Sequence, residues 1–163
     1  MRAAQLYGKY LVRLRMDPGP GNPPAILLRA YDGSWMPEVA FSENNGRLPQ
    51  VEMAMLHYGQ NSVKYSRLPL DLTVWHTVGL EWTPGKLVFT LDGLSWATIT
   101  GVGVPKVAIA MATQTEAWPC DSWAKCPNAS TPSPFNLYVD WVAVYRYAPV
   151  PAEREGRSLI ATD

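Results

Sequence analysis

Residues 38–43, with the sequence EVAFSE, form a short apolar run that carries a glutamate at each end. Its valine and phenylalanine are residue types that favour a β-strand. Successive side chains of a strand point to opposite faces, so Glu38 and Ala40 share one face and Glu43 falls on the other. A one-residue bulge at Phe41–Ser42 would return Glu43 to the face of Glu38, and bulges are common beside active sites.

Two glutamates on one face of a rigid sheet suit the chemistry of a retaining glycosidase. In that reaction one carboxylate is the nucleophile and the other acts first as acid and then as base, with the two carboxyl groups about 5–5.5 Å apart. The alternative, on these residues alone, is a solvated strand whose terminal glutamates have no chemical role.

The segments on both sides of this stretch also have the patterns of strands. Apolar and polar residues alternate, or short apolar runs occur, between turn signals. The Thr83-Pro84-Gly85 turn and the Asp92-Gly93 pair each predict a hairpin. No stretch shows sustained helical periodicity, so the sequence predicts an all-β sandwich or barrel. The strands expected besides 38–43 are 7–16, 25–28, 51–58, 75–82, 86–92, 95–99, 107–113 and 135–147.

The composition narrows the possible ligands. The 163 residues suit one domain, and fourteen basic residues balance fourteen acidic ones. This balance provides neither a basic surface for nucleic acid nor a polybasic segment for membranes. Seven tryptophans and eight tyrosines suit uncharged ligands with apolar faces, sugars among them, although many of these rings will be core.

The compartment stays open from the residues alone. No apolar run is long enough for a transmembrane span, and the N-terminus has no signal-peptide apolar region. A cytoplasmic protein and a mature or truncated form are both compatible with this. Cys120 and Cys126 make a poor zinc site without nearby histidines. A disulfide between them is expected and would favour an oxidising compartment.

Five segments, taken together and in order, resemble glycoside hydrolase family 16. These are YGKYLVRLRM, SWMPEVAFSEN, LHYG, WHTVGLEWTPGKLVFTLDG and YVDWVAVYRY, and the likeness runs from about Leu6 to about Tyr147. The resemblance implies a jelly-roll (concanavalin A-like) β-sandwich of two curved antiparallel sheets, whose concave face binds a β-glucan chain. It also implies a secreted, monomeric, retaining endo-1,3- or 1,3-1,4-β-glucanase that requires no cofactor.

The catalytic signature of that family is E-x-D-x-x-E. By resemblance Glu38 matches the nucleophile and Glu43 matches the acid/base, while Ala40 replaces the aspartate thought to tune them. This change implies reduced activity, and the alternative function is a catalytically impaired carbohydrate-binding homologue. The family's domain normally begins several strands earlier. We therefore expect a partial, N-terminally truncated domain at 1–147, with open sheet edges, and a polar tail at 148–163.

Other candidate site residues follow from the resemblance and from strand alternation. Trp35 either stacks on a sugar ring or packs under its loop, and Trp118 is a second candidate for the cleft wall. Gln114 and Glu116 share a face and could hydrogen-bond sugar hydroxyls. His57 is either a structural histidine or a substrate contact.

One further residue concerns a metal. Asp140 matches an aspartate that binds structural calcium in several members of the family. Calcium takes 6–8 oxygen ligands, some of them supplied in the family by N-terminal backbone. The alternative for Asp140 is a surface or turn-capping residue.

Overall fold

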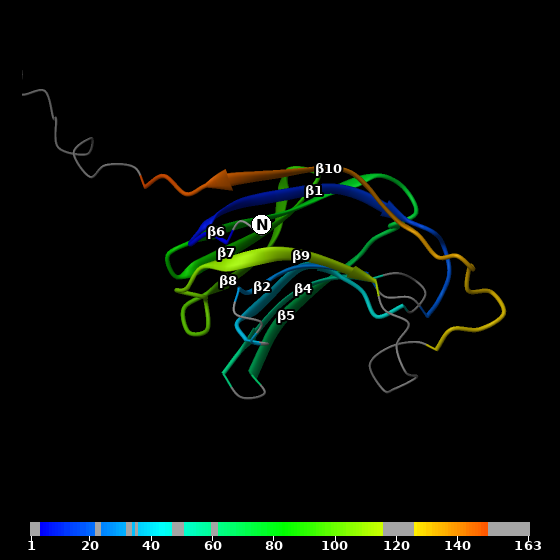
Figure 1. The fold of residues 1–163 in the computed structure, drawn as a ribbon, viewed down its shortest axis with the longest axis horizontal. Coiled ribbons are helices and arrows are strands. Elements are labelled where there is room, and N and C mark those ends of the chain that lie inside the picture. Colours follow the sequence, from blue (N-terminus) through cyan, green and yellow to red (C-terminus); the bar gives the residue numbers. More distant parts are fainter. Residues whose placement is uncertain are drawn as a thin grey trace, which may run out of the picture.

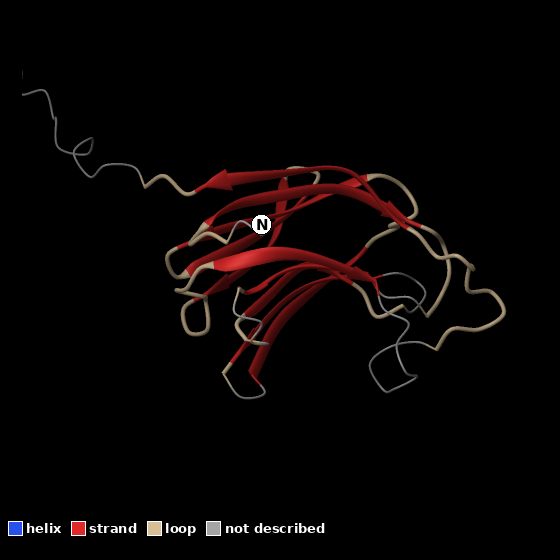
Figure 2. Cartoon of the chain, viewed as in Figure 1, coloured by secondary structure: helices blue, strands red, loops and turns tan. Residues whose placement is uncertain are grey.

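A computed structural model of the chain describes residues 4–21, 24–31, 34, 36–46, 51–59, 62–115 and 126–149. Within these ranges the chain forms ten β-strands and no helix (Figure 1 and Figure 2). Accordingly, this part of the chain offers no helix that could cross a membrane.

The strands form two five-stranded sheets in which all neighbours are antiparallel. Sheet A contains, in spatial order, β5 (Ser62–Pro69), β4 (Val51–Tyr58), β3 (Glu38–Glu43), β2 (Pro24–Ala30) and β9 (Ile109–Thr115). Sheet B contains β10 (Leu137–Arg146), β1 (Gly8–Met16), β6 (His76–Thr83), β7 (Lys86–Leu91) and β8 (Leu94–Thr100). The chain passes from one sheet to the other four times. The predicted all-β sandwich of jelly-roll type is confirmed.

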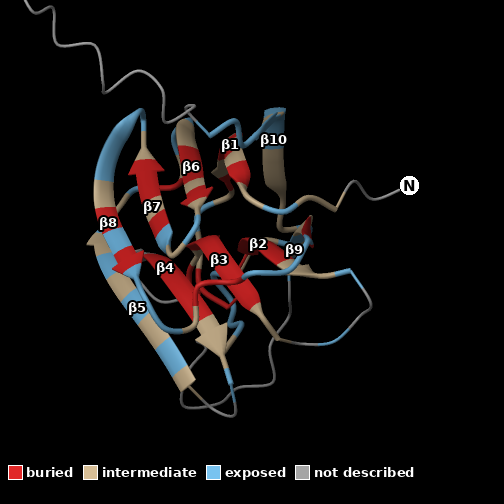
Figure 3. Ribbon diagram, turned by 90° about the vertical axis from the view of Figure 1, so that its left-hand side faces the viewer, coloured by how far each residue is buried: buried red, intermediate tan, exposed pale blue. Residues whose placement is uncertain are grey.

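The core lies between the two sheets and consists of the inward side chains of both (Figure 3). On β1 the alternation predicted from the sequence is visible directly, because Tyr10, Val12 and Leu14 are buried and the residues between them are only partly buried. Trp82 is fully buried and donates a hydrogen bond from Nε1 to the carbonyl of Pro105 at 3.2 Å. The buried ring therefore has the polar partner that an indole N–H requires.

The hairpins also form where turn chemistry predicted them. Thr83 pairs with Lys86 across Pro84 and Gly85, and Leu91 pairs with Leu94 across Asp92 and Gly93. Asp92 and Gly93 have φ angles of 49° and 84°. Two consecutive positive φ angles are those of a type I′ turn, whose twist matches that of the flanking strands.

One strand was missing from the sequence-based prediction. The strand β5 was not predicted, because its outward side chains are exposed and its sequence SVKYSRLP contains no apolar run.

The edge strand β10 is exposed on both faces. Val142 and Val144 pair with buried residues of β1 and yet are 44% and 48% exposed. Among the described strands, β10 pairs with β1 alone and forms one edge of sheet B.

We predict that Leu80→Ala lowers the free energy of unfolding by about 2–5 kcal/mol, because the side chain is fully buried between the sheets and its removal leaves a cavity. Urea denaturation followed by tryptophan fluorescence measures this loss. The matched control is Leu94→Ala, where the leucine is 75% exposed and the expected change is within about 0.5 kcal/mol. Equal losses in the two variants would contradict the placement of the core.

Candidate active site

The predicted bulge in β3 is confirmed by the sheet register. On the β4 side, Ala40 pairs with Met55 and Glu43 pairs with Met53, so two residues of β3 stand opposite one residue of β4. On the β2 side, Ala40 pairs with Leu27 and Ser42 with Ile26, which leaves Phe41 as the extra residue. Phe41 is buried in the core. The inserted residue therefore returns Glu43 to the face that carries Glu38.

We call the surface of sheet A that points away from sheet B the site face. Its residues form three rows across the five strands, each row read from β9 through β2, β3 and β4 to β5. The first row is Ala110, Arg29, Glu38, His57 and Val63; the second is Ala112, Leu27, Ala40, Met55 and Tyr65; the third is Gln114, Ala25, Glu43, Met53 and Arg67.

The first row holds a charged pair. Arg29 and Glu38 are direct cross-strand partners, and they form an ion pair in which Arg29 Nε is 2.9 Å from Glu38 Oε2. The side chain of Glu38 is only 10% exposed, whereas that of Arg29 is 42% exposed. A carboxylate that is this far removed from water needs a charged or hydrogen-bonding partner, and Arg29 provides one.

Arg29 flanks Glu38 from β2, and on the other side of Glu38 its cross-strand partner is His57 of β4. Its ring is half-buried. Burial lowers the pKa of His57 below the ordinary value for histidine, because desolvation disfavours the charged imidazolium. His57 is therefore neutral at neutral pH and adds no formal charge beside Glu38.

The second row is apolar around Ala40. Ala25, Leu27, Ala40, Met53 and Met55 form a buried cluster against which Ala112 packs. Ala40 itself is fully buried. The position between the two glutamates is therefore enclosed by hydrocarbon side chains.

Glu43 stands in the third row between Ala25 and Met53, and its Oε2 atom is closed off from solvent. Its position two rows from Glu38 corresponds to about 13 Å between Cα atoms, at about 3.4 Å per strand residue.

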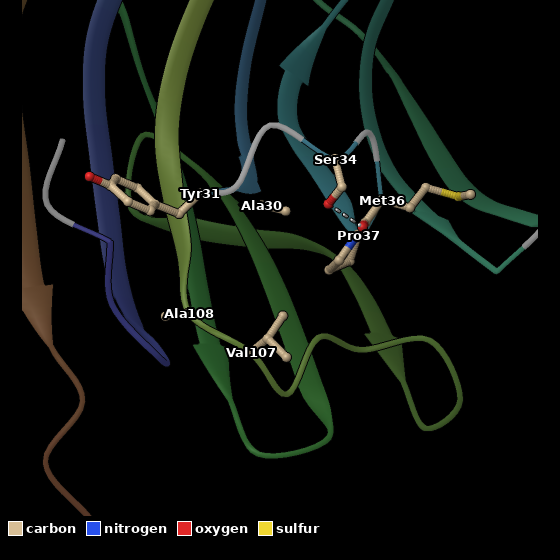
Figure 4. A pocket seen from close by; sticks show the side chains of 7 residues that line it. All are labelled: Ala30, Tyr31, Ser34, Met36, Pro37, Val107 and Ala108. Carbon is tan, nitrogen blue, oxygen red and sulfur yellow. Dashed lines mark hydrogen bonds between the residues drawn. The ribbon is translucent and has the colours of Figure 1, made fainter.

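A pocket of about 420 Å³ adjoins the Arg29–Glu38 end of the site face (Figure 4). It lies where β2 ends and β3 begins, and Ser34 Oγ at its rim donates a hydrogen bond to the carbonyl of Met36 at 3.2 Å. The residues that line it are Ala30, Tyr31, Ser34, Met36, Pro37, Val107 and Ala108.

The other candidates from the sequence separate into three groups. Gln114 lies on the site face in the row of Glu43, as strand alternation predicted. Trp35, Glu116, Trp118 and Cys120 lie outside the described residues. Cys126 is disulfide-bonded, and its pairing with Cys120 stays a prediction.

Asp140 is far from the site face, on the outer side of sheet B. Its Oδ2 atom forms an ion pair with Arg13 Nε at 3.2 Å, so this carboxylate already has a cationic partner. Among the described residues, no group of three or more His, Cys, Asp or Glu side chains could hold a metal ion. Structural calcium at Asp140 therefore receives no support from its described neighbours and stays a prediction.

Three residues of the site face were missed by the sequence reasoning: Arg29, Tyr65 and Arg67. Tyr65 is 54% exposed, and the Arg67 guanidinium stacks over its ring at 5.0 Å. Both lie on β5, the strand that the sequence-based prediction missed. Arg29 could be found only from the cross-strand register, which the sequence does not show.

Comparisons with known proteins agree on one family. The family model described as Glycosyl hydrolases family 16 matches residues 2–143. The chain is 32% identical over 93 residues to the endo-1,3-1,4-beta-glycanase ExsH of Rhizobium meliloti, a match that covers 55% of this chain and 20% of that protein. It is 27% identical over 177 residues to the beta-glucanase of Fibrobacter succinogenes, covering 96% of this chain and 48% of that protein.

Solved structures show the same fold. The laminarinase catalytic domain of Thermotoga maritima superposes with a TM-score of 0.79 at 18% identity, over 90% of this chain and 66% of that chain. The Bacillus licheniformis beta-glucanase superposes with a TM-score of 0.71 at 21% identity, over 90% of this chain and 69% of that chain. The two matches found by sequence cover 20% and 48% of those relatives, so this chain spans less than half the length of either.

We predict that Ala40→Asp lowers the free energy of unfolding by about 2 kcal/mol or more, because it places a carboxylate in a dry, apolar row without a new partner. Thermal and urea unfolding measure the effect. The control is Ala148→Asp at an exposed position, for which the change is expected to be within about 0.5 kcal/mol. An Ala40→Asp variant as stable as the parent would show that polar partners reach this row.

We also predict that the His57 ring takes up its proton below the ordinary pKa of about 6.5, in the direction set by its burial. The unfolded chain then binds this proton more readily than the folded chain. The free energy of unfolding should therefore increase as the pH rises from the lowered pKa to the ordinary pKa. The contribution of His57 should be lost as the pH falls through the lowered pKa. An NMR titration measures this, with the second of the two histidines distinguished by a His57→Gln variant. Titration of His57 at or above the ordinary value would contradict the burial.

Proposed function

Because the chain belongs to glycosyl hydrolases family 16, we propose that it is an endo-acting β-glucanase that cleaves 1,3- or 1,3-1,4-linked chains with retention of anomeric configuration. The observation that carries this proposal is the bulge in β3, which gives one face of a rigid sheet two glutamates. Relatives named as glucanases support a β-glucan as the substrate.

In the proposed mechanism Glu38 attacks the anomeric carbon while Glu43 protonates the leaving oxygen. The glycosyl–Glu38 ester that results is then hydrolysed by a water molecule from which Glu43 removes the proton. This reaction needs one carboxylate that is ionised and one that is protonated at the start. The ion pair with Arg29 supports ionisation of Glu38.

The remaining site-face residues are proposed to bind the sugar chain. Gln114 lies in the row of Glu43 and offers an amide to sugar hydroxyls, and Tyr65 exposes an aromatic ring at the far strand of the sheet. Trp35, Glu116, Trp118 and His57 stay predicted substrate contacts. A monomer that acts outside the cell is part of the proposal, and the disulfide at Cys126 supports an oxidising compartment.

A second candidate function is binding of β-glucan without hydrolysis. The apolar row around Ala40 favours it, because no described polar side chain in that row stands between the two glutamates. The two candidates differ in whether glycosidic bonds are broken, and both require the sugar-binding surface.

We predict release of reducing ends from laminarin or lichenan, and a loss of about 10²-fold or more in rate for Glu38→Gln and for Glu43→Gln. Reducing-sugar assays measure the rates, and proton NMR of the first product reports the anomer. The matched control is Glu81→Gln, since Glu81 pairs with Lys9 at the surface of sheet B and its loss should leave the rate unchanged. Glucan binding by a folded protein that releases no reducing ends would favour the non-hydrolytic candidate.

A further inference from the structure

The two site glutamates have different neighbours on the adjoining strands. Beside Glu38 stand Arg29 on β2 and His57 on β4. Beside Glu43 stand Ala25 and Met53, which are both apolar and buried. A cation on the neighbouring strand thus adjoins the carboxyl group of Glu38.

Of these neighbours, Arg29 forms a direct ion pair with Glu38. Its Nε atom is 2.9 Å from Glu38 Oε2, and the side chain of Glu38 is 10% exposed. The guanidinium is always charged. It therefore favours the charged form of a carboxylate that has little water around it.

We propose that Arg29 is a positioning residue for the proposed reaction: through its ion pair it holds Glu38 ionised as the nucleophile. This inference rests on the proposed function and deepens it. Nothing in the chemistry requires a carboxylate at position 40 if a cation acts on Glu38 from the neighbouring strand.

Electrostatics gives the direction of this effect. An opposite charge within about 4–6 Å favours the ionised form of a carboxyl group. Arg29 is 2.9 Å from Glu38, so it favours the carboxylate form of Glu38. An ionised nucleophile is what the proposed reaction needs at its start.

No other described group in the first row competes with Arg29. The outer members of that row, Ala110 on β9 and Val63 on β5, are uncharged. Burial keeps His57 neutral near pH 7 by lowering its pKa. In the neighbouring rows, Tyr65 is neutral and Arg67 lies in the row of Glu43, two strands away on β5.

The test compares Arg29→Met, which removes the charge but retains the length, with Arg29→Lys, which retains a charge without the planar geometry. Arg13→Met is the matched control, because Arg13 makes the same type of Nε–carboxylate contact, to Asp140, on the outer side of sheet B. Near-UV circular dichroism establishes that each variant is folded.

Two readouts are measured. The first is the pH profile of kcat/KM on lichenan, whose acid limb should move up by about one pH unit in Arg29→Met, a smaller distance in Arg29→Lys, and not at all in Arg13→Met. The second is the carboxyl carbon signal of Glu38 in ¹³C-glutamate-labelled protein without substrate, assigned with Glu38→Gln. Its titration should move in the same direction and by a similar amount.

The two readouts separate this inference from the proposed function. A Glu38 signal that titrates at the same pH in Arg29→Met and in the parent overturns the role of Arg29, even if the enzyme hydrolyses glucan. A parent that hydrolyses no glucan overturns the proposed function. In that case the NMR titration still decides whether Arg29 holds Glu38 ionised. If Arg29→Met does not fold, the titration in Arg29→Gln, which also removes the charge, decides, and an unmoved signal there overturns the inference.

Discussion

The extra residue in β3 is the constraint on which the rest of the site depends. Without it, strict alternation would place Glu43 among the apolar residues between the sheets, where an ionisable group is costly to bury. With it, Phe41 and Ser42 both stand opposite a single residue of β4, Phe41 joins the core, and Glu43 emerges on the site face. The core and the active-site geometry therefore depend on the same local irregularity.

The neighbouring strands determine what this bulge can do. The register with β2 places Arg29 beside Glu38, and the register with β4 places His57 on its other side. A slip of one residue in either pairing would exchange these groups for core side chains. The buried residues Leu28 and Leu56 lie next to Arg29 and His57 in sequence and face the core. Burial of these leucines thus fixes the register that brings the arginine and the histidine to Glu38.

The sequence predicted the local features of this protein well and its cross-strand features poorly. The two hairpins and nine of the ten described strands follow from alternation and turn chemistry, which are properties of contiguous residues. Alternation alone places Glu43 on the face opposite Glu38, and the bulge was only the condition for bringing it back. The strand β5 escaped because an edge strand with alternating exposed side chains lacks an apolar run. Arg29 escaped because its significance comes from pairing with a residue nine positions later in another strand. A sequence pattern carries little information about which residues of two strands stand opposite each other.

Ala40 and Arg29 make physical sense together. A site with carboxylates at positions 38, 40 and 43 would place three acids on one strand, and their mutual repulsion would need protons or cations to offset it. Here the middle row is hydrocarbon, and the charge that acts on Glu38 comes from the side, through Arg29. An apolar middle row also lowers the local dielectric response, which strengthens the pull of Arg29 on Glu38. With alanine at position 40, a middle carboxylate no longer distinguishes the two glutamates. The ion pair between Arg29 and Glu38 therefore matters more. On this argument the altered position is compatible with a working pair of carboxyl groups, provided that the arginine stays in place.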